Sequence, residues 1–176
     1  MATLGVHTYE QATSVSTPNV AKVGIPFVVG TAPVHTAAKP AKANVPVLAT
    51  SWEEAVEKLG FSYDWKKYTL CEFLYSHFQL FGCQPAIFCN VLDPAEMKEA
   101  AEAKEYPVAG HQAVLPLEAL AASLTVTVKG TGEDGSDAAL KADEDYSVFY
   151  GRDDSDAYVC VLELLEDGGA YDAASL

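Results

Sequence analysis

The feature that most constrains the fold lies between Asp64 and Pro94, where a helical pattern runs directly into a short apolar strand. Thr69 and Glu72 have the spacing of a capping box, in which two side chains satisfy the first backbone N–H groups of a helix. The pattern predicts a helix over 70–81 that ends at Gly82, where a left-handed residue is typical. The residues that recur at helical spacing are Leu70, Phe73, Leu74, His77, Phe78 and Phe81.

The segment 86–92 is almost wholly apolar and stops at Asp93-Pro94. Such a run is typical of a strand that is covered on both faces, as in a parallel α/β sheet. The helix and this strand together predict an α/β core.

The preceding segment supplies further elements of that core. Strands are predicted over 23–30 and 45–49, with a loop over 31–44 between them. Ser51 and Glu54 form a second capping box, and the inner face and stop of the helix that follows are formed by Trp52, Ala55, Val56, Leu59 and Gly60. These elements are too few for a complete doubly wound domain, so the sheet is predicted to be unfinished.

The net charge of −14 is confined to the second half of the chain. Residues 1–92 contain six acidic residues and six lysines, whereas 93–176 contain 19 acidic and five basic residues. This step predicts a domain boundary near 93–105. The acidic surface argues against direct binding to nucleic acid, because its phosphates are repelled.

The second half has the pattern of an antiparallel β-module. Residues 123–129 alternate between apolar and polar side chains, which predicts a half-exposed strand. The segments 146–150 and 158–164 flank the polar stretch 151–156 and predict a β-hairpin. The chain ends at 174–176 without a terminating element, as though a further strand had been cut short.

The predicted fold class is therefore α+β, in three parts. Residues 1–20, rich in Thr, Ser and Val, are interpreted as an extended arm that could reach on the order of 60 Å. A merely disordered terminus is the alternative, and composition alone favours it. Residues 21–94 form the first segment of an incomplete α/β core, and 95–176 form an acidic β-rich domain that is truncated.

Cysteine usage and hydropathy place the chain in a reducing compartment. The cysteines form no CxxC pair, which favours reduced thiols over a disulfide framework and predicts a cytosolic protein; they are Cys71, Cys83, Cys89 and Cys160. The first residues lack the pattern of a signal peptide, and no run approaches the roughly 18 apolar residues that cross a bilayer. Neither export nor membrane insertion is predicted.

Residues with the chemistry of catalytic or metal sites are present but scattered. No histidine has a second ligand at metal-binding spacing; the four are His7, His35, His77 and His111. The acidic clusters at 133–137, 143–145 and 153–156 lack the register of a calcium-binding loop and are more typical of solvated surface. No phosphate-binding glycine motif or nucleophile elbow occurs. We predict no catalytic, cofactor-binding or metal site, and no cofactor.

The residues alone are also compatible with two other classes of protein. An incomplete α/β enzyme with a β-rich regulatory module would place polar residues at the carboxyl ends of its strands, where only Asn90 and Asp93 are candidates. Asp93 before Pro94 is more simply a strand terminator. The second alternative is a calcium-binding adhesive β-module with an α/β companion.

The run YTLCEFLYSHFQLFG over 68–82, followed by PAIFCNVLDP over 85–94, closely resembles the first core segment of contractile tail sheath proteins. This family occurs in myovirus-type bacteriophages and phage-tail-like bacteriocins. The segments GVHTYEQATSVSTP, VGIPFVVGTAPV and VPVLATSWEEAVEKLGF are similar in the same order, and DYSVFY over 145–150 resembles the inserted β-domain more loosely. Family members are much longer, so the chain is interpreted as an N-terminal portion.

The resemblance implies a structural protein of the virion tail, not an enzyme. Such subunits assemble in the host bacterial cytoplasm as stacked hexameric rings around a tail tube, joined by strand exchange through the N-terminal arm. They contract on a signal from the baseplate and drive the tube through the host envelope, for genome ejection in phages. The implied partners are other copies of the chain and the tail tube, baseplate and tail terminator proteins.

Overall fold

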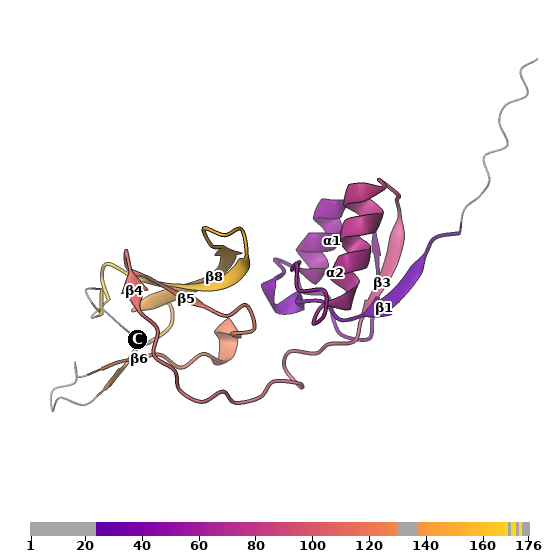
Figure 1. Cartoon of the computed structure of the whole chain (residues 1–176). Helices are drawn as coiled ribbons and strands as arrows, with labels where there is room; N and C mark the ends of the chain where they lie inside the picture. Colours follow the sequence, from indigo (N-terminus) through magenta and orange to yellow (C-terminus); the bar gives the residue numbers. More distant parts are fainter. Residues whose placement is uncertain (1–23, 130–136, 169, 172, 174–176) are drawn as a thin grey trace, which may run out of the picture.

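The structure is a computed structural model that describes residues 24–129, 137–168, 170–171 and 173, and its fold is α+β. Figure 1 shows two bodies, each with its own sheet, joined by an extended segment, 91–107, that contains no helix or strand. We call the first body, 24–90, the α/β module and the second, 108–173, the β-module. The predicted arm at 1–20 and the chain end at 174–176 lie outside the described residues.

The α/β module is built on a mixed three-stranded sheet. Its strands are β1 (Phe27–Gly30), β2 (Pro46–Ala49) and β3 (Ala86–Asn90), in the order β1-β3-β2. The central strand β3 runs parallel to β1 and antiparallel to β2. Since β1 and β2 each pair only with β3 among the described residues, both are edge strands.

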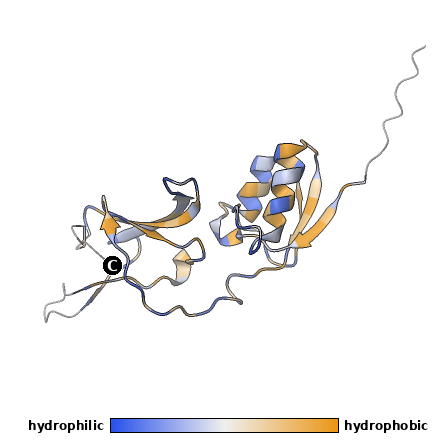
Figure 2. Cartoon of the chain, in the orientation of Figure 1, coloured by the Kyte–Doolittle hydropathy of each residue, from blue (hydrophilic) through white to orange (hydrophobic). Residues whose placement is uncertain are grey.

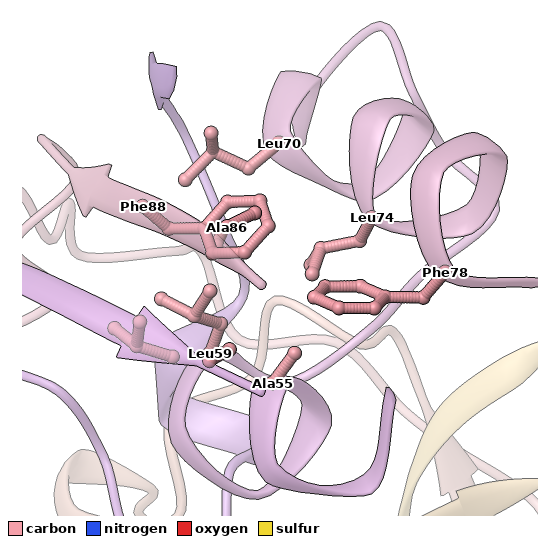
Figure 3. Packing of buried hydrophobic residues seen from close by; sticks show 10 residues of the cluster. Ala55, Leu59, Leu70, Leu74, Phe78, Ala86 and Phe88 are labelled. Atoms are coloured by element: carbon pink, nitrogen blue, oxygen red, sulfur yellow. The ribbon is translucent and has the colours of Figure 1, made fainter. Parts of the chain in front are cut away.

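Helices cover one face of this sheet. They are α1 (Trp52–Leu59), α2 (Thr69–Leu74) and a π-helical turn, η2 (Tyr75–Leu80), that continues α2. Figure 3 shows side chains from the helices and from β3 pointing toward one another in a single core. The buried members are Ala32, Val34, Ala49, Ala55, Leu59, Leu70, Leu74, Phe78, Ala86 and Phe88. This core fixes the arrangement of the module.

The predicted helix over 70–81 exists, but two details of it are wrong. It changes from α to π geometry at Tyr75, and Thr69 is not its N-cap, so the first capping box does not form. Thr31, at the end of β1, satisfies the helix start instead: its Oγ1 accepts from Thr69 N–H at 3.1 Å and its carbonyl oxygen accepts from Leu70 N–H at 3.0 Å. Gly82 is left-handed (φ 60°), as predicted.

The second capping box forms in part. Ser51 is the N-cap of α1, and its Oγ accepts from Glu54 N–H at 3.2 Å. The Glu54 carboxylate bonds to Thr50 N–H at 2.8 Å and to Lys58 Nζ at 2.6 Å. The hydrogen bond from Lys58 is the main reason that the pKa of Glu54 falls to about 2. The start of α1 is therefore determined locally.

The β-module is an antiparallel sheet with a separate small ribbon. Its four strands, in the order β4-β5-β9-β8, are β4 (Val108–Ala109), β5 (Gln112–Leu115), β8 (Tyr146–Arg152) and β9 (Tyr158–Leu164). The predicted hairpin is confirmed as β8 and β9, which pair along their whole length. The ribbon pairs β6 (Thr127–Val128) with β7 (Ala138–Ala139).

The predicted strand over 123–129 is wrong in its extent. Residues 121–123 form a short 3-10 helix, η3, and only Thr127 and Val128 enter a ladder. Val126 and Val128 are nevertheless buried while Thr125 and Thr127 are exposed, as the alternation predicts. The alternation therefore predicts which side chains are buried. It does not predict how many of these residues pair with another strand.

Candidate functional site

Among the described residues, no helix covers the second face of the α/β sheet, which is apolar. Val28 and Phe88 point into the helical core, so their neighbours Phe27, Val29 and Ile87 point the other way. Phe27 and Val29 are each 56% exposed, and Leu48 is 47% exposed. Phe27, Ile87 and Leu48 lie side by side in register across β1, β3 and β2. We call Phe27, Val29, Leu48 and Ile87 the outer sheet face.

This exposed face corrects the prediction that 86–92 is covered on both sides. Figure 2 colours β1 and β3 as largely hydrophobic, although among the described residues helices cover only one face of the sheet. The strand is also shorter than predicted, since it ends at Asn90. A contiguous apolar surface of this kind is typical of an interaction site.

The groove beside the edge strand β2 does not gather catalytic groups. It is an open depression of about 550 Å³ whose lining includes Lys39, Leu48, Glu54 and Lys58. Its charges are neutralised locally, because Lys39 pairs with Glu57 at 2.6 Å and Lys58 pairs with Glu54 at 2.6 Å. Lys58 Nζ also donates to the Leu48 carbonyl oxygen at 3.2 Å, which partly satisfies the β2 edge.

The side chain of Asn90, a catalytic candidate of the enzyme alternative, is hydrogen-bonded to backbone groups. Its Oδ1 accepts from Ala32 N–H at 2.9 Å and from Leu92 N–H at 3.1 Å, and its Nδ2 donates to the Leu92 carbonyl oxygen at 2.6 Å. Asp93 Oδ1 accepts from Ala95 N–H at 3.0 Å in an exposed turn. The structure thus gives both candidates a role in chain turns.

Replacing Asn90 by alanine is expected to lower the free energy of unfolding by about 2–3 kcal/mol, because the buried N–H group of Ala32 and the partly buried backbone groups of Leu92 lose their partners. Urea unfolding followed by tryptophan fluorescence measures this, since Trp52 and Trp65 both lie in the α/β module. Asp93→Ala is the control and should change stability by less than about 1 kcal/mol. Equal losses in the two variants would contradict the assignment.

The described histidines and acidic loops make packing contacts and hydrogen bonds within the fold. The His77 ring stacks on Phe73, with ring centroids 4.8 Å apart, and His111 Nδ1 lies 2.8 Å from the Tyr171 carbonyl oxygen. Asp153 accepts hydrogen bonds from its own loop, including Ala157 N–H at 3.0 Å. Within the described ranges, no three His, Cys, Asp or Glu side chains gather as a metal site would require. His7 and most of the 133–137 cluster lie outside them.

The cysteines are free thiols and three of them are buried: Cys71, Cys89 and Cys160. Burial raises the pKa of the Cys71 thiol to about 12 and that of Cys160 to about 11. A thiol becomes a nucleophile as the thiolate, so neither is activated near neutral pH. Cys83 is exposed.

Comparisons with protein-family models, with curated proteins and with solved structures find no match to this chain. In the part of the chain that the structure describes, no helix has the length and apolar character needed to span a bilayer. Among the features described above, the outer sheet face supports a functional interpretation, because its apolar side chains are exposed and contiguous.

Sequence reasoning missed this face because the apolar run 86–92 predicts a strand covered on both faces. Phe27 and Val29 alternate with Val28 and Gly30, and this period of two was the available signal. The signal distinguishes two faces of a strand. It does not tell which of two apolar faces the helices will cover.

Proposed function

We propose that this chain is a structural subunit of a contractile tail sheath, which polymerises around a tail tube and contracts to drive the tube through a host envelope. The sequence resemblance over 68–94 is the basis for naming this class of assembly. The structural observation that supports it is the exposed outer sheet face of the α/β module. The outer strands of this sheet, β1 and β2, are both edge strands among the described residues. Function then lies in contacts between copies of the chain and not in bond chemistry.

Charge favours the α/β module as the place of contact between copies. Residues 1–92 carry no net charge, whereas the second half carries the whole excess of −14. Two acidic β-modules repel each other, while two α/β modules can approach without that cost. Burying the outer sheet face against a neighbouring subunit then gains about 25 cal/mol for each Å² of apolar surface.

The arm is the proposed coupling element between subunits. Residues 1–20 precede β1, which is an edge strand, and an extended segment added to a neighbour's sheet edge supplies directional main-chain hydrogen bonds. Such a link leaves the subunits able to rotate without separating. The proposed partners remain other copies of the chain, the tail tube, the baseplate and the tail terminator.

The double variant Phe27→Ser/Val29→Ser is expected to abolish self-association while leaving the far-UV circular dichroism spectrum unchanged, because both side chains are exposed and outside the core. The unmodified chain should form higher-order species as its concentration rises. Sedimentation velocity measures the association, and negative-stain microscopy shows whether rings or tubes form.

Leu80→Ser/Phe81→Ser is the matched control, because these side chains are 61% and 74% exposed but belong to the end of the helix. This control should associate as the unmodified chain does. An unmodified chain that stays monomeric at every concentration would contradict the proposed assembly. A face variant that associates normally would show that the contact lies elsewhere.

A further inference from the structure

The two modules meet at a small aromatic interface that the proposed assembly does not use. Its buried members are Phe61, Tyr68, Cys71 and Leu117, and of these Leu117 belongs to the β-module. The Phe61 and Tyr158 rings lie 5.7 Å apart across the interface. Lys67 of the α/β module also forms an ion pair with Glu118. We call this contact the module interface.

His35 bridges the module interface through one ring nitrogen. Its Nε2 lies 2.8 Å from the Leu117 carbonyl oxygen, and because a carbonyl only accepts, Nε2 carries the proton and donates. The His35 ring also packs edge-on against Tyr150 of the β-module, with ring centroids 5.5 Å apart. Tyr150 in turn holds the loop that presents Leu117, since its hydroxyl donates to the Ala119 carbonyl oxygen at 2.9 Å.

The second ring nitrogen of His35, Nδ1, is buried and has no hydrogen-bond partner in the part of the chain that the structure describes. With the proton on Nε2, the docked imidazole is therefore neutral. Protonation would place a positive charge and an unsatisfied N–H group at a buried position, which is unfavourable. A separated interface exposes the ring and lets water solvate both nitrogens. Proton binding and module docking therefore oppose each other.

We propose that His35 is a proton-sensitive latch, whose neutral ring holds the β-module against the α/β module and whose protonation releases it. This inference concerns the arrangement of modules within one chain and does not depend on the proposed sheath function. The bistable element is the module interface, and the extended segment 91–107 keeps the modules connected when it opens.

The other ionisable groups that face His35 do not change charge in the same range. Burial raises the pKa of Tyr68 to about 12 and raises the pKa of Tyr150, so both phenols stay neutral. Glu118 also lies near the ring. Burial raises the pKa of Glu118, but the hydrogen bond from Lys67 and further interactions outweigh this and lower the pKa below its ordinary value. Burial outweighs the Leu117 and Glu118 contributions and lowers the pKa of His35 below its ordinary value of 6.5.

The direction of the pH effect follows from linkage. The docked form has the lower His35 pKa, so it binds fewer protons than the open form. Docking is at full strength above about pH 6.5, the ordinary value for histidine, and weakens as the pH falls below it. Acidification should therefore weaken module docking.

Small-angle scattering of the full chain at pH 7.5 and pH 5.0 tests the latch. We expect the radius of gyration to increase reversibly at pH 5.0 while the far-UV circular dichroism spectrum is unchanged. His35→Gln retains an N–H donor but does not titrate, so its radius of gyration should be the same at both pH values. His77→Gln is the matched control, because His77 also has a buried unpartnered ring nitrogen but lies outside the interface. It should respond as the unmodified chain does.

An NMR titration of the unmodified chain keeps the test independent of whether a variant folds. The His35 ring signals and the Leu117 amide signal should shift together with one midpoint below 6.5. A midpoint at or above 6.5, or a Leu117 signal that does not follow the ring, would overturn the latch. So would a radius of gyration that is constant in the unmodified chain, or a pH response that persists in His35→Gln.

Discussion

Replacing Gly60 by alanine is expected to lower the free energy of unfolding by about 3–4 kcal/mol, the sum of backbone strain and overpacking. Gly60 has φ 69° and ψ 179°, a combination that is essentially restricted to glycine. An added Cβ would also collide with the Pro33 carbonyl oxygen and with Thr36 Oγ1. Urea unfolding followed by tryptophan fluorescence measures the loss.

Gly82→Ala separates backbone strain from collision. Gly82 also has a positive φ, 60°, but a Cβ there meets no atom within 4 Å. Its replacement should cost only about 1 kcal/mol, the usual penalty for a left-handed alanine. If the two variants lost the same stability, close packing of Gly60 against the segment around Pro33 would not be the reason for the larger effect.

The second large effect is expected at Phe88, whose replacement by alanine should cost about 3–5 kcal/mol. Phe88 is fully buried on the central strand, and its ring lies 6.0 Å from the rings of both Phe73 and Phe78. Removing the Phe88 ring leaves a cavity between the sheet and the helix. Figure 3 shows the core side chains that surround this ring. Native domains are stable by only about 5–15 kcal/mol, so this is a substantial fraction.

Phe81→Ala is the matched control for Phe88, because the same side chain is 74% exposed at the end of the helix. Its removal should change the free energy of unfolding by less than about 0.5 kcal/mol. Thermal unfolding monitored at 222 nm should rank the variants in the same order as urea. A loss at Phe81 as large as that at Phe88 would contradict the assignment of the core.

Local sequence signals predicted the helices and the hairpin well. Ser51 and Gly60 bound α1 as the pattern indicates, and both signals act within one helical turn. The hairpin of β8 and β9 was also predicted, because two apolar segments flank a polar turn. These elements depend on interactions between residues close together in the chain.

The start of α2 shows where local signals fail. The spacing of Thr69 and Glu72 fits a capping box, but Thr31 lies near enough to satisfy the helix start. Thr69 Oγ1 then accepts from Thr31 N–H at 3.1 Å and is not free to cap its own helix. A partner 38 residues away in sequence cannot be recognised from the pattern around Thr69.

The candidate site was predictable in composition but not in location. Apolar residues on both faces of the strands are visible in the sequence, and they predicted a sheet with two covered faces. The helices occupy only one face, so Phe27 and Val29 stay exposed among the described residues. Asn90 was predicted as a polar residue at a strand end, but its hydrogen bonds to Ala32 and Leu92 became visible only in the fold.

The sequence by itself determined the two helices, the hairpin, the apolar character of the strands and the division between a neutral and an acidic half. The tertiary structure alone decided the mixed strand order, the uncovered sheet face, the cap from Thr31 and the bridge from His35 to Leu117. The physical reason is the distance along the chain between the residues that interact. Capping and periodicity act within a few residues, whereas the hydrogen bond of His35 joins positions 82 residues apart and exists only once both modules have folded.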